Sequence, residues 1–283
     1  MSEPRYFKNW AVPGGGVPGE SDPALGQTGE GESLDALSGR FKIFQLRDGH
    51  RFSTDDIITA WYGTSHAPSV RRVLDLGSGI GSVGMTAAWR LPFARFVTVE
   101  AQEQSVALAR RSARYNGLED RYEIRQGDFR DPGVIRPEEK FDLVMGSPPY
   151  FPLDSGVLGD HPQKIACRFE VRGTVADYCG TAARHLGHGG FFACVFPVNP
   201  PHQLQRVIDG ARQAGLTILR WRPVVLKEGE APLLGLFGMV LSEHLQPGIR
   251  EGGFEEPALV IRRKDGSIHP EYRAVKQSIG FRP

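Results

Sequence analysis

Short apolar runs alternate with amphipathic stretches through most of this chain, between about residues 72 and 240. The apolar runs predict strands at "RVLDLG", "ARFVTVE", residues 122–125, "FDLVMG", "GFFACVF", "LTILRW" and "LLGLFGMVL". Between them, apolar residues at helical spacing predict helices over residues 80–89, 103–115, 175–186 and 202–214. This alternation is typical of an α/β fold with a doubly wound, mainly parallel sheet. Such a sheet binds ligands at the carboxyl ends of its strands.

The pattern divides the chain into three parts. Residues 11–32 hold seven Gly and three Pro with few large apolar side chains, so we expect residues 1–36 to form a flexible tail. Residues 37–245 are the predicted domain. Its leading segment, residues 37–66, contains the strand pattern "FKIFQL" and Asp55, which we expect to cap a helix over residues 56–62. Residues 246–283 form a C-terminal extension, predicted as a hairpin that turns at Asp265-Gly266.

Composition excludes some classes of protein. The formal net charge of +1 is too small for the whole molecule to attract a polyanion, so any nucleic-acid binding needs a local basic patch. Three cysteines at irregular spacing form neither a disulfide framework nor a metal-binding pattern, which favours a reducing, cytoplasmic setting. No stretch of 18 apolar residues occurs, and the first ten residues lack an apolar core. We therefore expect no membrane span and no signal peptide.

A glycine-rich loop follows the first strand of the alternation. Its glycines are Gly77, Gly79, Gly81 and Gly84. The last three match G-x-G-x-x-G, a weak signal that indicates a turn where backbone approaches a ligand. Asp75 lies just before the loop and favours a cationic, ammonium-bearing ligand over a pyrophosphate. The alternative is that Asp75 pairs with Arg71 or Arg72.

Acidic residues also end the next two strands. Glu100 can accept hydrogen bonds from both hydroxyls of a ribose, although dinucleotide sites use the same device. Asp128 can accept from an adenine amino group while Phe129 packs beside the ring. The alternative for Asp128 is an ordinary turn or helix-capping aspartate.

The strand "FDLVMG" runs directly into Ser147-Pro148-Pro149-Tyr150. Two consecutive prolines lack N–H groups and fix φ, so they end the strand rigidly. The residue before a proline is held out of the α region, which keeps Ser147 extended.

Together, "VLDLGSGIG", "TVEA", "GDF" and "SPPY" resemble the class I S-adenosylmethionine-dependent methyltransferases of the branch that methylates amino groups. Over residues 40–240 the chain is most similar to the bacterial tRNA (adenine-N6)-methyltransferase family, as "FQLRDGHRFSTDDIITAW" and "IACRFEVRGTVADYCG" also indicate. The resemblance implies a Rossmann-like sheet of seven strands with an antiparallel last strand. It also implies S-adenosylmethionine as cofactor, tRNA as partner and no metal.

The resemblance also implies roles for individual residues. The Ser147 side chain and the Pro148 carbonyl would accept the hydrogens of the target amine, Pro149 would stiffen the loop and Tyr150 would stack on the target base. Thr54 and Asp55 would contact the methionine half of the cofactor, with helix capping as the alternative for Asp55. The family usually has Asn where this chain has Ser147, and Ser at this place resembles some cytosine-N4 methylating enzymes.

An RNA substrate requires cations near the loop of residues 147–150, which would act on the target amine and is called the reactive loop. The predicted substrate contacts are Phe151, Lys164, Arg168 and Arg172. Arg110, Arg111 and Arg114 are expected to form a solvated helix face. Two alternatives remain open: methylation of a glutamine amide in a translation release factor, and an inactive scaffold that binds only the cofactor or RNA.

Overall fold

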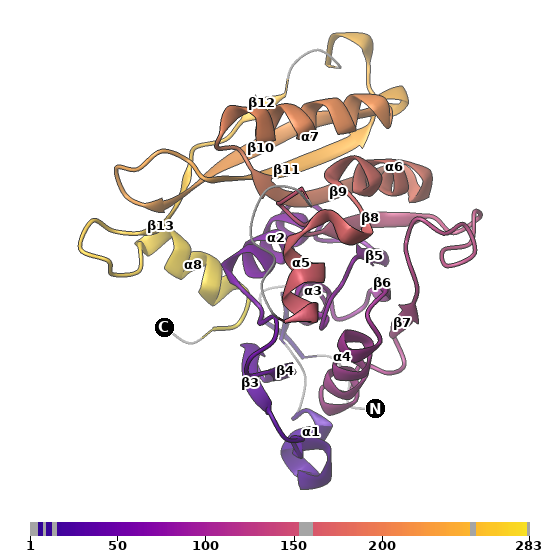
Figure 1. Cartoon of the computed structure of the whole chain (residues 1–283), viewed down its shortest axis with the longest axis vertical. Coiled ribbons are helices and arrows are strands. Elements are labelled where there is room, and N and C mark those ends of the chain that lie inside the picture. The colour runs from indigo at the N-terminus through magenta and orange to yellow at the C-terminus, as the bar shows by residue number, and fades with distance from the viewer. Residues whose placement is uncertain (1–4, 8–9, 13–15, 153–160, 250–252, 282–283) are drawn as a thin grey trace.

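The computed structural model describes residues 5–7, 10–12, 16–152, 161–249 and 253–281. A mixed sheet of nine strands lies at its centre (Figure 1). Its strands are β5 (Arg72–Leu76), β6 (Arg95–Glu100), β7 (Tyr122–Gln126), β8 (Phe141–Gly146), β9 (Leu186–Pro197), β10 (Leu216–Lys227), β11 (Leu234–Leu241), β12 (Phe254–Glu255) and β13 (Leu259–Arg262). The first seven confirm the predicted alternation.

The strand order is β12-β10-β11-β9-β8-β5-β6-β7, and β13 also pairs with β10. Strands β5 to β9 run parallel, whereas β11 is antiparallel to both of its neighbours, β9 and β10. The predicted antiparallel last strand of the seven is therefore confirmed. Strand order reverses between β5 and β8, so the loops after these two strands open away from each other and leave room for a ligand.

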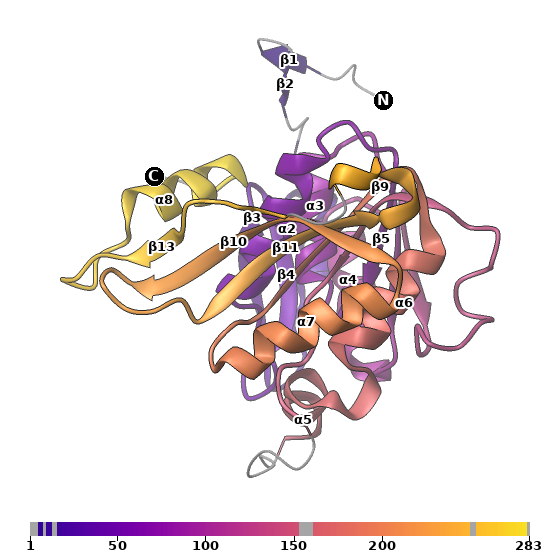
Figure 2. The same cartoon turned by 90° about the horizontal axis from the view of Figure 1, so that it is seen from above.

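Helices cover both faces of the sheet (Figure 2). They are α2 (Thr54–His66), α3 (Ser82–Arg90) and α4 (Glu103–Tyr115) on one face and α6 (Val175–His185) and α7 (Pro201–Gln213) on the other. Successive residues of a strand enter opposite cores: Phe191 packs with the first group of helices and Phe192 with the second. This explains why the strands are continuous apolar runs, since a parallel sheet is buried on both faces.

Helix α2 begins at Thr54, two residues earlier than the predicted helix over residues 56–62. Ser53 is the N-cap: its hydroxyl accepts from the Asp55 N–H at 3.2 Å, while the Asp56 carboxylate accepts from the Ser53 N–H at 3.1 Å. The prediction that Asp55 caps the helix is therefore wrong. Because Ser53 and Asp56 form the capping box, the Asp55 side chain is available for another partner.

The second half of the predicted flexible tail contains regular structure. It forms α1 (Pro18–Ser21), a 3-10 turn (Pro23–Gly26) and β3 (Glu32–Ser38), which pairs antiparallel with β4 (Phe41–Leu46). Gly19 lies flat against the Tyr115 ring, where a Cβ would approach ring carbon Cδ2 to 2.1 Å. Because Gly19 has no side chain, its backbone can pack closely on the Tyr115 ring. The composition of this segment did not indicate such packing. Earlier in the chain, β1 (Arg5–Phe7) pairs with β2 (Trp10–Val12).

Arg111 ties this N-terminal segment to α4. Its guanidinium donates to both carboxylate oxygens of Glu32 at 2.8 Å and to the Gln27 carbonyl at 2.7 Å, and it stacks 4.1 Å from the centre of the Phe44 ring. The prediction that Arg111 belongs to a solvated face is therefore wrong.

Arg111→Lys is expected to lower the free energy of unfolding by about 1 kcal/mol, because an ammonium cannot reproduce the bidentate and stacked contacts. Urea denaturation monitored by circular dichroism measures the change. Arg114→Lys is the matched control, since Arg114 and its partner Glu119 are both about 60% exposed and their pair contributes little. Equal effects of the two substitutions would contradict the assigned role of Arg111.

The C-terminal extension differs from the predicted hairpin. The turn at Asp265-Gly266 is present, with Gly266 at φ +85° and its N–H donating to the Arg263 carbonyl at 2.9 Å. An isolated bridge joins Arg262 to Ile268, with the Arg263 and His269 N–H groups donating to the Ser267 and Ile261 carbonyls. The chain then forms α8 (Pro270–Ser278) instead of a second strand. Pro270 occupies the first helical turn, a place where its missing N–H costs no hydrogen bond.

Shorter helical segments complete the described chain. They are α5 (Pro162–Arg168) and 3-10 turns at Glu170–Arg172, Ser242–His244 and Pro247–Ile249. None of the helices in the described ranges has the length and apolar content needed to span a membrane.

Candidate active site

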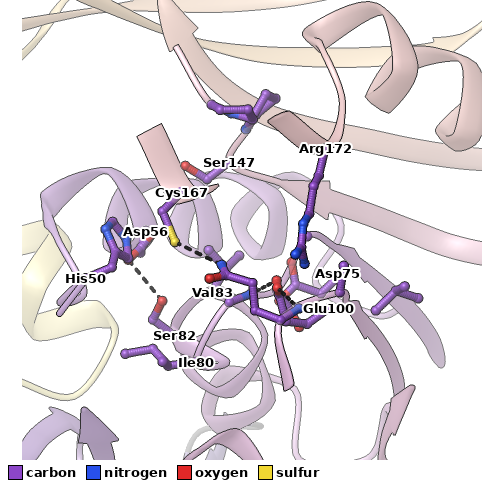
Figure 3. Close-up of a pocket in the computed structure, with 18 of the residues that line it drawn as sticks. His50, Asp56, Asp75, Ile80, Ser82, Val83, Glu100, Ser147, Cys167 and Arg172 are labelled. Carbon is purple, nitrogen blue, oxygen red and sulfur yellow. Dashed lines mark hydrogen bonds between the residues drawn. The ribbon is translucent and has the colours of Figure 1, made fainter. Parts of the chain in front are cut away.

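A cavity of about 490 Å³ opens at the carboxyl ends of β5, β6 and β8 (Figure 3). All but three of the predicted site residues line it, namely Asp55, Asp75, Gly77, Gly79, Glu100, Asp128, Phe129, Ser147, Pro148, Pro149, Tyr150, Phe151, Arg168 and Arg172. Thr54, Gly81 and Lys164 are not among the lining residues. The cavity therefore joins the glycine loop (residues 77–84) and the loop of residues 147–150, here called the proline loop. These two loops lie about 70 residues apart in sequence.

The glycines of the loop have different functions. Gly77 has φ +60°, and a Cβ there would lie 2.1 Å from the Tyr178 hydroxyl oxygen. Gly79 has φ +54°, and a Cβ would meet nothing within 4 Å, so its bare backbone borders open space. Gly81 is the N-cap of α3 at φ +92° and faces Met85 in the core. Gly81 thus shapes the turn, and its contact with a ligand stays a prediction.

Asp75 is buried, and none of the arginines that the structure describes pairs with it. Its Oδ2 atom accepts from the Gly84 N–H at 2.9 Å, while Oδ1 has no hydrogen-bond partner in the described structure. The backbone N–H groups of Arg71 and Arg72 instead donate to Asp142. The alternative that Asp75 pairs with either arginine is therefore wrong, and one carboxylate oxygen remains for a ligand.

Burial raises the pKa of Asp75 well above its ordinary value of 3.8, and Asp56 and Glu100 nearby raise it further. The folded protein therefore keeps this proton to higher pH than the unfolded chain does. Stability contributed by this group is greatest below pH 3.8 and decreases as the pH rises through the raised pKa.

Asp75→Asn removes this titration. The free energy of unfolding of the variant minus that of the wild type is expected to increase with pH above 3.8, at up to about 1.4 kcal/mol per pH unit. Urea denaturation at a series of pH values measures it. Asp142→Asn is the control, because Asp142 also accepts from backbone N–H groups but is exposed. A difference independent of pH would contradict the assignment.

Glu100 fixes the glycine loop. Its Oε2 accepts from the Gly79 N–H at 2.9 Å and its Oε1 from the Gln102 N–H at 2.7 Å. Burial raises the pKa of Glu100, and these backbone bonds and the Arg172 guanidinium oppose the shift. In Figure 3 the Arg172 side chain points toward Glu100. Each carboxylate oxygen retains a second lone pair, which a ribose hydroxyl can use.

The Asp128 carboxylate serves a local turn in this structure. It accepts from the backbone N–H of Arg130 at 2.9 Å and forms an ion pair with the Arg130 guanidinium at 2.5 Å, and this hydrogen bonding lowers the pKa of Asp128. The alternative of a turn aspartate is thus realised, while Asp128 still lines the cavity. Phe129 is buried and packs edge-on against Tyr178, with ring centres 4.6 Å apart.

The proline loop is held from several sides. Pro148 and Pro149 are buried, and the Tyr150 ring packs edge-on against Phe196 with centres 5.7 Å apart. The Tyr150 hydroxyl donates to Asp55 Oδ2 at 2.6 Å. Burial raises the pKa of Tyr150 well above its ordinary value, and the Asp55 charge raises it further. Asp55 therefore fixes the ring of the reactive loop.

Several lining residues escaped the sequence analysis. They are His50, Ser53, Asp56, Ser82, Gln102, Cys167 and Tyr178, among others. Asp56 accepts from the Ser82 hydroxyl at 2.9 Å and so joins α2 to α3. In the sequence, its position next to Asp55 was the signal that could have indicated a site residue. Cys167 accepts weakly from Gln102 at 3.6 Å, and burial raises the pKa of its thiol to about 12 (Figure 3).

Besides Gly81, Thr54 and Lys164 are the predicted site residues that do not line the cavity. Thr54 interacts with Tyr272 of α8. Lys164 lies on α5, and together with Arg168 its charge helps to lower the pKa of His50, although burial is the larger cause. Among the described residues, no group of three or more His, Cys, Asp or Glu side chains is arranged to hold a metal ion.

Comparison with known proteins identifies the type of site. Residues 63–156 match the family model described as the methyltransferase small domain. A tRNA1(Val) (adenine(37)-N6)-methyltransferase from Porphyromonas gingivalis is 33% identical over 162 residues, which cover 56% of this chain and 63% of that protein. The protein of the same name from Yersinia pestis is 30% identical over 187 residues, covering 62% of this chain and 67% of the relative.

The fold has a counterpart among solved structures. A protein from Agrobacterium tumefaciens, described as a predicted O-methyltransferase, superimposes with a TM-score of 0.60 at 17% identity, covering 81% of this chain and 98% of the other. The fold and the motifs together define an S-adenosylmethionine-dependent methyltransferase. Within that class, the chain belongs to the family of the tRNA1(Val) (adenine(37)-N6)-methyltransferases.

Proposed function

We propose that this enzyme transfers a methyl group from S-adenosylmethionine to the exocyclic N6 amine of an adenine in tRNA. The observation that carries the proposal is that the Ser147-to-Tyr150 loop borders the same cavity as Asp75, Gly79 and Glu100. One wall therefore offers acceptors for an amine, and the opposite wall offers carboxylates for a cationic cofactor. The names of the curated relatives support tRNA and adenine as substrate.

The residues present fit the cofactor. The free Oδ1 atom of buried Asp75 suits an ammonium group, Glu100 suits the two ribose hydroxyls and the open backbone at Gly79 permits close approach. Phe129 offers an apolar contact for the adenine ring. When bound, S-adenosylmethionine supplies an electrophilic methyl group on a positively charged sulfur.

The reactive loop acts on the amine. An exocyclic amine on a base is a poor nucleophile, because its lone pair is delocalised into the ring. The Ser147 hydroxyl and the Pro148 carbonyl would accept its two hydrogens and favour tetrahedral geometry at nitrogen. The buried prolines hold the carbonyl in place before the substrate arrives, so little reorganisation is needed during the reaction.

Serine in place of the usual asparagine is compatible with this function. Ser147 forms a hydrogen bond with Tyr150 that opposes the rise in the pKa of the tyrosine. A serine hydroxyl that donates to Tyr150 keeps its lone pairs for the amine. Ser147→Asn is therefore expected to retain adenine methylation, whereas Ser147→Ala removes an acceptor.

A labelling experiment tests the substrate. Purified enzyme is incubated with tritiated S-adenosylmethionine and with RNA and protein fractions from a strain that lacks the gene. We expect label in the tRNA fraction, recovered as N6-methyladenosine after digestion and mass spectrometry of the nucleosides. N4-methylcytidine would overturn the adenine assignment, and label confined to protein would overturn the RNA substrate in favour of a glutamine amide.

Cofactor binding without turnover on either fraction would identify an inactive scaffold. Because tRNA is processed where translation occurs, the proposal also predicts a cytoplasmic enzyme. Fractionation of cells that carry the tagged chain checks this location.

A further inference from the structure

Two large apolar side chains are exposed beside the mouth of the cavity. Phe151 is 45% exposed and Val171 is 42% exposed, although apolar residues of this size are normally buried. The exposed side chain of Arg168 lies with them, and both Phe151 and Arg168 line the cavity. We refer to Phe151, Arg168 and Val171 as the flanking ledge.

The flanking ledge is rigidly joined to the reactive loop. The backbone N–H groups of Tyr150 and Phe151 both donate to the Arg168 carbonyl, at 3.2 and 3.1 Å, and the Glu170 N–H donates to the Phe151 carbonyl at 2.9 Å. The Phe151 ring also contacts Phe169, with centres 5.9 Å apart. The ledge therefore has a fixed position relative to Tyr150.

An ion pair beneath the ledge strengthens this attachment. Glu170 pairs with Arg206 of α7, and the Arg206 guanidinium in turn stacks on Phe196, the ring that also supports Tyr150. Successive residues of an extended segment point to opposite sides. Tyr150 therefore points inward to Asp55 and Phe196, while the next ring, Phe151, faces solvent.

We propose that the flanking ledge binds the unpaired nucleotide next to the methylated base; this inference rests on the proposed function. The neighbouring base stacks on Phe151 beside Val171, and the Arg168 guanidinium contacts the adjoining phosphate. Arg168 is exposed and lines the cavity, so its guanidinium can meet an anion at the cavity mouth. Exposed aromatic rings and guanidinium groups are the means by which proteins bind unpaired nucleotides.

A peptide substrate fits the flanking ledge less well. An extended peptide binds an edge through free backbone N–H and C=O groups. Here the N–H groups of Tyr150, Phe151 and Glu170, and the carbonyls of Phe151 and Arg168, are already paired within the ledge. Because these groups are paired, binding would have to come from the side chains of the ledge. An aromatic ring and a guanidinium group suit the base and the phosphate of a nucleotide.

Phe151→Ala is the principal test. With the tRNA fraction from the deletion strain as substrate, we expect KM to rise about tenfold, while kcat and the Kd for S-adenosylmethionine stay within about twofold. Phe151→Trp should restore KM, because it keeps a ring for stacking. Phe254→Ala is the matched control, since Phe254 is 59% exposed on the edge strand β12, and it should leave KM unchanged.

Arg168→Ala tests the phosphate contact. KM should rise, and the slope of log KM against log salt concentration should become shallower by about one, as expected for the loss of one phosphate contact. Arg212→Ala is the control, because Arg212 is 75% exposed near the end of α7. It should leave the salt dependence as in the wild type.

The outcomes separate the two proposals. Methylation of RNA with KM unchanged in both ledge variants would overturn the flanking ledge and leave the proposed function intact. A weakened Kd for S-adenosylmethionine in Phe151→Ala would also overturn it, because the ring would then support the cofactor site. Methylation of protein alone would overturn the proposed function, and with it the nucleotide as occupant.

Discussion

Tyr150→Ala is expected to lower kcat about 100-fold or more, while the Kd for S-adenosylmethionine changes less than about twofold. In the proposed reaction the target base stacks on this ring, so its loss would remove both binding energy and alignment of the amine. Asp75 and Glu100, which the proposal assigns to the cofactor, accept from the N–H groups of Gly84, Gly79 and Gln102, and the substitution leaves these bonds in place. Single-turnover kinetics with the tRNA fraction and calorimetry with the cofactor measure the two quantities separately.

Tyr150→Phe separates the ring from its hydroxyl. It keeps the stacking surface but loses the hydrogen bond to Asp55 at 2.6 Å, so kcat should fall by only about tenfold. Tyr62→Phe is the matched control, because Tyr62 donates to Glu256 at 2.8 Å in an equivalent pair outside the cavity. Wild-type turnover in Tyr150→Ala would refute the stacking role.

Glu100→Gln is expected to weaken the Kd for S-adenosylmethionine by about 10- to 100-fold. The carboxylate accepts from the Gly79 and Gln102 N–H groups, and an amide has only one oxygen to offer them. One N–H would then face the donor NH2 group of the glutamine, at a cost of about 1.5–3 kcal/mol for a hydrogen bond to a charged group. The same substitution removes an acceptor for the ribose hydroxyls.

Isothermal titration with S-adenosylmethionine measures this effect. Asp142→Asn is again the control, because that carboxylate also accepts from two backbone N–H groups, at 2.8 and 2.9 Å, and does not line the cavity. It should leave the cofactor Kd unchanged. Unaltered affinity in Glu100→Gln would show that Glu100 only supports the turn and does not serve the cofactor.

The sequence by itself determined the layout of the sheet and the main walls of the cavity. Strands buried on both faces must be apolar runs, and glycines, acids and prolines that follow such runs must gather at one edge, because parallel strands end on the same side. For this reason Asp75, Glu100 and Ser147 could be placed near one another from their positions in the chain. Helix boundaries such as those of α4 followed from a clear amphipathic pattern.

Tertiary structure alone decided how individual side chains are used. Asp55 and Tyr150 are 95 residues apart, and nothing local in either segment indicates their hydrogen bond. The packing of Gly19 on Tyr115 and the pairing of Arg111 with Glu32 likewise depend on surfaces that form only when distant segments meet. The physical reason is that sequence patterns report the surroundings a residue prefers, whereas a specific partner is selected by the geometry of the whole fold.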